Sequence, residues 1–229
     1  MIYLVLALVL LFLIYGPQLW IRHVMWRHST VIEGMPGTGG ELAEHLVDQF
    51  NLEGVTVERT QPWGDHYDPS SRTVRLSPQN FDGKSLTAVA VAVHEIGHAL
   101  QHQDNDRRLI RRVKLAPIMR LVEQTGTGLL VAAPVLGMLL RTPAPVLLLA
   151  AGGLAALFAR VVLHTMTLPV EFDASFNRAL PIIHQGRYVS PQEEPAVRQV
   201  LQAAALTYVA SALADVLSIW RWLWILRRG

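Results

Sequence analysis

The chain has no cysteine and few charged residues. The absence of cysteine excludes disulfides, thiolate-bound zinc, iron–sulfur clusters and a cysteine nucleophile. Charged residues make up 17% of the 229 positions and hydrophobic residues 51%, whereas an ordinary soluble domain has about 25% charged residues. The net charge of +2 is too small to indicate nucleic-acid binding. Any metal must be held by Asp, Glu or one of the nine histidines.

The first long uncharged run lies at the amino terminus. Residues 1–21 carry no charged side chain, and a helix that spans a bilayer needs about 20 such residues. The alternative is a signal peptide, which has a basic segment before its apolar run and a small-residue cleavage site after it. Neither feature is present, since Gly16-Pro17 and then Arg22 follow. The run therefore predicts an uncleaved transmembrane anchor.

Two further uncharged runs, 125–140 and 146–159, are separated by a turn-like segment with two prolines, 141–145. They predict a transmembrane hairpin over 125–163, with a pair of buried helices in a soluble core as the alternative. The small residues of 150–156 favour the membrane, because they let helices approach closely in lipid.

A fourth apolar stretch covers 203–226 and belongs to a C-terminal segment, 203–229. It carries Asp215 and Arg221. It can span the bilayer or lie in the interface as an amphipathic helix, and spanning is favoured.

Basic residues near these runs predict the topology. Lys and Arg are retained on the cytoplasmic side of a membrane. Arg22 and Arg27 follow the first run closely and place the segment after it in the cytoplasm. Arg227 and Arg228 favour the reverse orientation if the last stretch spans. We expect a multi-pass protein of the bacterial inner (cell) membrane with its active site facing the cytoplasm. The basic residues before the second run agree with this topology: Arg107, Arg108, Arg111, Arg112, Lys114 and Arg120. The four arginines 107, 108, 111 and 112 fit lipid-headgroup contacts.

The polar segments 28–124 and 164–202 predict one small α+β unit made in two parts. Residues 41–50 have helical spacing, residues 55–58 and 73–76 alternate like strands, and 65–71 has the composition of a turn. A helix is expected over 104–120 with a break at Pro117, and another after Pro169.

Ser85 is a good N-cap for a helix from Leu86 to about His102. This segment is apolar nearly all round, and such a helix is expected to be buried.

The expected buried helix contains the sequence His94-Glu95-Ile96-Gly97-His98. Residues four apart lie one above the other on a helix face, so His94 and His98 can bind one zinc ion. Glu95 projects beside the metal and can act as general base, and then acid, on a zinc-activated water. Burying three polar side chains in an aliphatic helix costs several kcal/mol unless they are paired or metal-bound. The motif predicts one catalytic Zn²⁺ per chain.

A catalytic zinc takes three protein ligands and leaves one position open. Glu171 is the leading candidate for the third ligand, although an acid at a helix start is also explained by the helix dipole. The competing oxygen ligands are Asp173, Glu193 and Glu194.

Four other residues have possible roles around such a site. Asp173 and Ser175 are candidate hydrogen-bond partners of the ligands. His66 and Tyr67 can polarise a scissile carbonyl and contact substrate, or they can instead fix the turn before the next strand.

These motifs resemble the YugP-like family of membrane-bound neutral zinc metallopeptidases, a gluzincin-type group similar in motif to the HtpX-type peptidases. The resemblance implies that Glu171 is the third zinc ligand. The related peptidases have an Asp four residues after that ligand, where this chain has Ser175. The matching pieces, in chain order, are Asp65-His66-Tyr67-Asp68-Pro69, Val74-Arg75-Leu76-Ser77, Ala90 to Gln101, Thr167 to Ser175 with Arg178-Ala179-Leu180, and Ala203 to Ala210.

We therefore predict a mainly α-helical integral membrane protein with a small α+β zincin-like catalytic unit. Its expected activity is that of a zinc-dependent endopeptidase acting on a protein or peptide substrate, membrane-anchored or misfolded, in contact with the lipid bilayer and without nucleic acid. The alternative is a non-hydrolytic membrane scaffold or partner protein that retains a structural zinc, although a structural site has no need of Glu95. Hydrolysis of an amide outside a peptide is a third reading.

Overall fold

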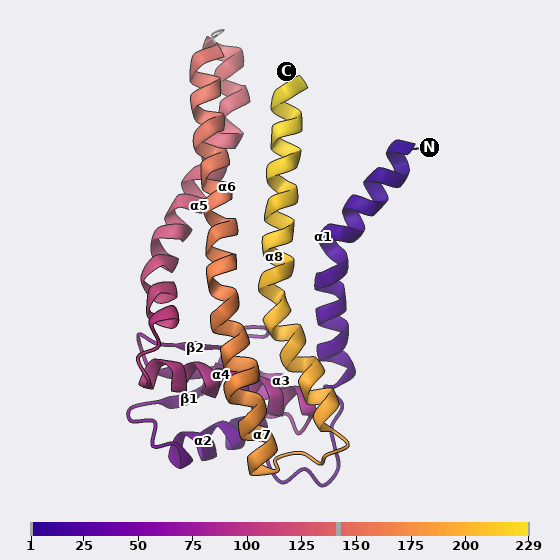
Figure 1. The fold of residues 1–229 in the computed structure, drawn as a ribbon, viewed down its shortest axis with the longest axis vertical. Helices are drawn as coiled ribbons and strands as arrows, with labels where there is room; N and C mark the ends of the chain where they lie inside the picture. The colour runs from indigo at the N-terminus through magenta and orange to yellow at the C-terminus, as the bar shows by residue number, and fades with distance from the viewer. Residues whose placement is uncertain (1, 141–142, 229) are drawn as a thin grey trace. The chain divides into compact units, whose positions relative to one another are not determined.

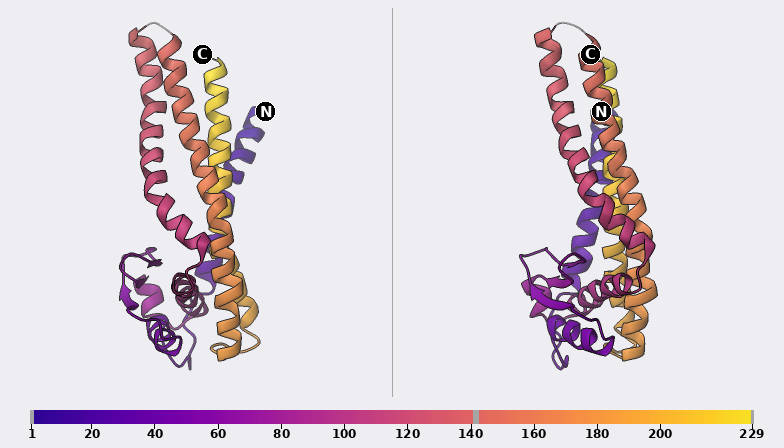
Figure 2. Two further views of the ribbon diagram at one scale, coloured as in Figure 1. Left: turned by 60° about the vertical axis from the view of Figure 1, so that its left-hand side comes forward. Right: turned by 90° about the vertical axis from the view of Figure 1, so that its left-hand side faces the viewer.

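The computed structural model describes residues 2–140 and 143–228. Those residues form long helices and one small sheet (Figure 1), and Figure 2 gives two further views. The elements, in chain order, are α1 (Ile2–Arg27), α2 (Gly39–Gln49), β1 (Thr56–Arg59), β2 (His66–Asp68), β3 (Thr73–Leu76), α3 (Pro78–Phe81), α4 (Leu86–Gln103), α5 (Arg107–Leu140), α6 (Pro143–Phe172), the π-helix η1 (Asp173–Ala179), α7 (Leu180–Gly186) and α8 (Glu194–Arg228).

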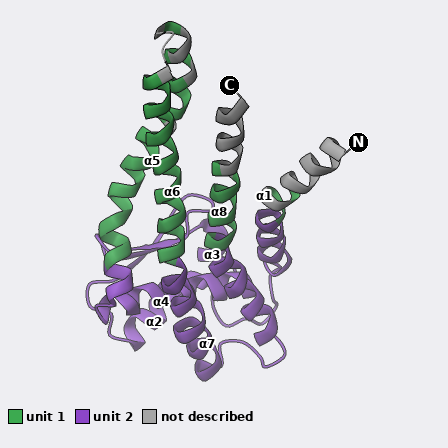
Figure 3. Ribbon diagram, turned by 45° about the horizontal axis from the view of Figure 1, so that its top comes forward, with its two compact units in different colours: residues 1–16, 111–167, 208–229 green, residues 17–110, 168–207 purple. Residues whose placement is uncertain are grey.

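The chain divides into two compact units, coloured separately in Figure 3. The mixed unit consists of Pro17–Ile110 and Leu168–Thr207 and contains the sheet, α4 and η1. The helical unit consists of Met1–Gly16, Arg111–Thr167 and Tyr208–Gly229.

The sheet of the mixed unit has the strand order β1-β3-β2. β1 pairs with β3 in parallel, from Thr56 opposite Thr73, so β1 lies one residue later than the predicted strand over 55–58. The strand predicted over 73–76 is confirmed. The turn predicted over 65–71 is wrong for its first part, because His66–Asp68 pairs antiparallel with β3 as strand β2. The backbone hydrogen bonds between β2 and β3 stabilise an extended conformation here, although the composition of the segment favours a turn.

Helix α4 forms the core of the mixed unit, as predicted. The Ser85 hydroxyl accepts a hydrogen bond from the backbone N–H of Ala88 and caps the helix. Every residue from Leu86 to Ala99 is buried, and the helix contacts α2, α3, η1, β2 and β3. A helix surrounded in this way needs an apolar surface on all sides, and this is what its sequence supplies.

Two proline-based predictions are wrong. α5 continues through Pro117, and α6 contains Pro169 rather than beginning after it. Proline removes one backbone hydrogen bond, but the helical bonds on both sides of it remain. α6 instead changes character after Phe172, where it passes into the π-helix η1.

The helical unit contains segments of α5 and α6 that run side by side (Figures 1 and 2). They approach closely at glycines, because a Cβ atom added to Gly153 would lie 3.0 Å from the carbonyl oxygen of Gly126. The small residues expected to allow close helix packing therefore do so. The turn residues Arg141 and Thr142 lie outside the described residues.

Two helical stretches among the described residues, Val146–Gly186 and Glu194–Leu217, are long and apolar enough to cross a membrane. The predicted N-terminal anchor falls within helix α1, and most of its side chains lie outside the described part of the chain. The same is true of the side chains of residues 220–229 at the end of α8.

A buried ion cluster joins three helices of the helical unit. Asp215 on α8 has a side chain only 7% exposed, and its carboxylate lies 3.1 Å from Nη2 of Arg160 and 3.3 Å from Nε2 of His164, both on α6. The second terminal nitrogen of Arg160 lies 3.2 Å from the carboxylate of Glu123 on α5. The positive charge of Arg160 therefore compensates the buried carboxylate of Asp215.

We expect Arg160→Leu to be more destabilising than the double change Arg160→Leu/Asp215→Leu. The single change leaves Asp215 buried without its cation, which costs about 3 kcal/mol, at the low end of the range for broken buried ion pairs, because 32% of the Arg160 side chain is exposed. The double change removes both charges and leaves the half-exposed Glu123 in contact with solvent. Thermal unfolding of the detergent-solubilised full chain measures the difference. Equal midpoints for the single and double variants would show that the pair is not coupled.

Candidate metal centre

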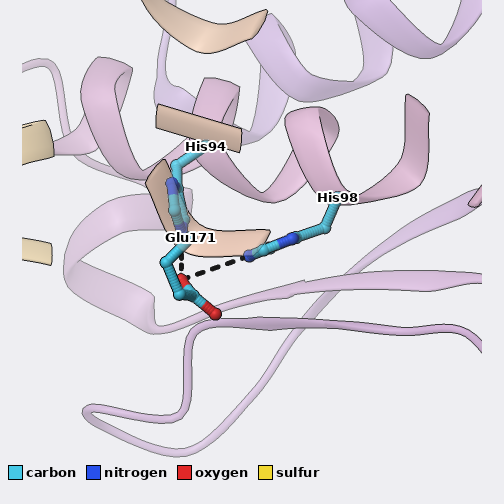
Figure 4. A group of neighbouring side chains, drawn as sticks. All are labelled: His94, His98 and Glu171. Carbon is cyan, nitrogen blue, oxygen red and sulfur yellow. Dashed lines mark ion pairs between the residues drawn. The ribbon is translucent and has the colours of Figure 1, made fainter. Parts of the chain in front are cut away.

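Two elements of the mixed unit bring His94, His98 and Glu171 together. The histidines lie one turn apart on α4, and Glu171 is the penultimate residue of α6. Nε2 of His94 lies 3.2 Å from Oε2 of Glu171, and Nε2 of His98 lies 3.5 Å from the same oxygen. Figure 4 shows both imidazole rings turned toward that carboxylate. All three side chains are buried.

The spacing of these atoms fits a zinc ion. Zinc binds imidazole nitrogen and carboxylate oxygen at about 2.0–2.1 Å in tetrahedral geometry, which places neighbouring ligand atoms about 3.3 Å apart. The two nitrogen–oxygen distances lie on either side of that value, and one ligand atom from each residue lies within 4.8 Å of the others. Two neutral imidazoles with one carboxylate are also the donor set of catalytic zinc sites in hydrolytic enzymes.

The hydrogen bond at Nδ1 of His94 leaves its Nε2 free to bind a metal. This Nδ1 atom lies 3.1 Å from the hydroxyl oxygen of Ser175 on η1. When the Ser175 hydroxyl donates to the carbonyl oxygen of Leu201, at 3.4 Å, it accepts a hydrogen bond from the N–H at Nδ1. Ser175, four residues after Glu171, is thus the hydrogen-bond partner of His94.

The same arrangement holds for His98. Its Nδ1 lies 2.9 Å from Oε1 of Gln101, whose amide nitrogen donates to Oδ2 of Asp173 at 2.9 Å. Burial disfavours the charged form of Asp173, but hydrogen bonds from Asn177, Gln101 and Arg178 lower the pKa of this carboxyl to about 2. Asp173 therefore contacts His98 through Gln101 and is not directed at the metal position itself.

Glu95 is buried beside the cluster, on the same helix as both histidines. Burial raises the pKa of its carboxyl to about 7, since removal from water disfavours the charged form, although His94 acts in the opposite direction. The backbone of Tyr67 on β2 also acts to lower this pKa. A carboxyl group with a pKa near neutrality can both accept and return a proton.

The structure places the two other predicted residues on strand β2. His66 is exposed, and its Nδ1 donates to the carbonyl oxygen of Gly64 at 2.6 Å, which stabilises the turn before the strand. The Tyr67 side chain is buried, and its hydroxyl lies 2.8 Å from Nδ1 of His102. The Tyr67 hydroxyl therefore contacts His102, four residues beyond the second histidine of the motif.

The competing carboxylates have other hydrogen-bond partners. Glu193 accepts from the backbone N–H and hydroxyl of Ser190, and Glu194 lies 2.7 Å from Nδ1 of His184.

Sequence reasoning missed Gln101 and His102. Their spacings of three and four residues from His98 on a predicted helix are the signal that could have found them, because such residues lie on one face.

Gly97 allows α4 to lie against η1. A Cβ atom at this position would lie 2.8 Å from the carbonyl oxygen of Ala174, closer than atoms pack. The glycine within the histidine motif is therefore required by the approach of the segment that carries Glu171 and Ser175.

A family model described as "Putative neutral zinc metallopeptidase" matches residues 3–227 of the chain. The chain belongs to this family. It is also 36% identical over 230 residues, covering 100% of this chain and 98% of the relative, to the "Putative membrane protease YugP" of Bacillus subtilis (strain 168). No solved structure matches the chain. Membership of the zinc metallopeptidase family agrees with the donor set formed by His94, His98 and Glu171.

We expect Gly97→Ala to weaken zinc binding and to destabilise the mixed unit by about 1–3 kcal/mol, the usual cost of overpacking. The added methyl group must push η1, and with it Glu171, away from α4. Gly128→Ala on α5 is the matched control, because an added Cβ there meets nothing within 4 Å. Zinc affinity and the unfolding midpoint measure both effects, and identical behaviour of the two variants would contradict the close packing.

Proposed function

We propose that this protein is a membrane-bound zinc endopeptidase. The observation that carries the proposal is the convergence of two imidazole nitrogens and one carboxylate oxygen in a buried site, with both Nδ1 atoms hydrogen-bonded elsewhere. Glu95 adds a buried carboxyl group beside these ligands, which a structural zinc site does not need. The family to which the chain belongs supports the same activity.

His94, His98 and Glu171 would hold the zinc ion. When bound, zinc supplies a Lewis acid that polarises a substrate carbonyl and lowers the pKa of water. Glu95 accepts a proton on its carboxylate from the attacking water, as the water oxygen forms a bond to the carbonyl carbon. Glu95 then returns this proton to the amide nitrogen as the C–N bond breaks. The products are a carboxylic acid and an amine, and the acid passes its proton to the amine to give a carboxylate and an ammonium group.

The substrate class that we propose is a protein or peptide that is membrane-anchored or misfolded. Two helices long and apolar enough to cross a membrane support a membrane location, as does the name of the bacterial relative. A multi-pass topology in the bacterial inner membrane fits the apolar runs of the sequence. The basic residues at the end of α1 and the start of α5 favour a cytoplasmic active site.

Glu95→Gln should retain zinc and lose turnover. The amide preserves the shape of the side chain but cannot accept the proton of water, and loss of a general base reduces the rate by about 10²–10⁴-fold. Hydrolysis of a fluorescent casein and of membrane proteins by purified, zinc-loaded protein measures the loss. Full turnover by the variant would contradict the role of Glu95 as general base. Zinc binding without turnover in the unaltered protein would favour a non-hydrolytic scaffold.

Removal of a zinc ligand, unlike the Glu95→Gln change, should weaken zinc binding itself. We expect His94→Ala, His98→Ala and Glu171→Ala each to weaken zinc binding by more than about 100-fold, beyond the 10–100-fold loss that follows removal of a ligand's hydrogen-bond partner. His184→Ala and Glu194→Ala are matched controls, since these two residues pair with each other and are not among the proposed ligands. Competition with a chromogenic chelator measures the affinities. An undiminished affinity in Glu171→Ala would exclude it as the third ligand.

A further inference from the structure

Gln101 contacts both segments that carry the proposed zinc ligands. It lies on α4 three residues after His98, and its side chain is 0% exposed. Its amide oxygen faces the ring of His98, and its amide nitrogen donates to the backbone carbonyl of Val170, the residue before Glu171. We propose that Gln101 is a positioning residue that orients His98 and holds the backbone at Glu171, and so sets the affinity of the metal centre. This inference rests on the proposed function.

The hydrogen bonds of Gln101 fix the orientation of its amide group. The amide nitrogen lies 2.9 Å from the Val170 carbonyl oxygen and 2.9 Å from Oδ2 of Asp173. A carbonyl oxygen and an ionised carboxylate accept hydrogen bonds and cannot donate them. A flipped amide would direct its oxygen at two other oxygens, so the nitrogen must lie on this side. Oε1 therefore faces His98.

This orientation determines the tautomer of His98. Because Oε1 of Gln101 can only accept, Nδ1 of His98 must carry the proton that it donates at 2.9 Å. The lone pair of the neutral ring then lies on Nε2, the atom that points toward Glu171. Ligand histidines depend on such a bond at the second ring nitrogen for their orientation and basicity.

The far end of this chain of hydrogen bonds is held rigidly. Oδ2 of Asp173 also accepts from Nε of Arg178 at 3.1 Å, and Oδ1 accepts from Asn177 at 2.9 Å. Arg108 at the start of α5 lies 3.3 Å from the same carboxylate. Two cations and an amide therefore fix Asp173, and Gln101 cannot rotate without losing a charge-assisted hydrogen bond.

His94 has a less restrictive partner. The Ser175 hydroxyl that contacts its Nδ1 can rotate and can act as donor or acceptor. Its bond to the Leu201 carbonyl, at 3.4 Å, is long. Of the two histidines, His98 is thus the one whose tautomer is imposed by the surrounding groups, and Gln101 is the residue that imposes it.

The first test replaces Gln101 with methionine, which has a similar length and no amide. Gln101→Met should weaken zinc binding by about 10–100-fold, measured by chelator competition on the full chain in detergent, and should change the visible absorption of the Co²⁺-loaded protein. Gln103→Met is the matched control, since the side chain of this exposed glutamine of the same helix donates to the backbone carbonyl of Asn51, away from the metal ligands. A zinc affinity within twofold of the unaltered protein would overturn the proposal.

The second test keeps the polar character of the site. Gln101→Glu retains an acceptor for His98 but directs its other oxygen at the Val170 carbonyl and Asp173, so it should bind zinc at least tenfold more weakly. Adding Asp173→Asn restores the hydrogen bond with donor and acceptor exchanged and keeps the total charge. The double variant should recover part of the lost affinity, because the contact with position 173 is restored while the Val170 carbonyl still faces an oxygen. A double variant no better than Gln101→Glu would overturn the proposal even if Gln101→Met fails to fold, which circular dichroism of the metal-free protein reveals.

The outcomes also separate this inference from the proposed function. If the unaltered protein binds no zinc, the proposed function fails. If it binds zinc and cleaves substrate while Gln101→Met and Gln103→Met bind zinc equally well, only the role of Gln101 fails.

Discussion

The burial of polar groups on α4 is the constraint on which the rest of the mixed unit depends. His94, Glu95, His98 and Gln101 are buried in a helix whose other buried residues are almost all aliphatic, and other elements enclose it. A polar group buried without a partner costs several kcal/mol, so each of these side chains needs a specific acceptor or donor. The segment packed against α4 supplies them: η1 provides Ser175 for His94 and Asp173 for Gln101.

This requirement explains the departure from regular helix geometry after Glu171. The π-helix η1 begins two residues after Glu171 and carries both Asp173 and Ser175. Asp173 and Ser175 make hydrogen bonds to side chains of α4, and the Glu171 carboxylate lies beside His94 of the same helix. π-helical turns are rare in proteins, and those that occur are often found at functional sites. The close approach of η1 to α4 in turn depends on the missing side chain of Gly97.

Much of the fold followed from local patterns. The N-cap at Ser85, the burial of α4 and the strand β3 were predicted because capping, periodicity and alternation act over a few residues. The errors arose where a local signal competed with distant contacts. Residues 66–68 have turn composition but pair with β3, and Pro117 and Pro169 are breakers in isolation but lie within long helices.

The sequence by itself determined which two imidazoles and which carboxyl group share the motif on α4, because a spacing of four residues fixes a common helix face. It also indicated apolar stretches over 146–159 and 203–226, which overlap the two described helical stretches that are long and apolar enough to cross a membrane. Only the tertiary structure decided that Glu171, rather than Asp173, Glu193 or Glu194, meets those imidazoles. It also decided that Gln101 and Ser175 are the hydrogen-bond partners of Nδ1 of His98 and Nδ1 of His94, respectively. The reason is physical: spacing along one helix is set by backbone geometry, whereas contacts between α4 and η1 depend on how segments distant in the sequence pack together.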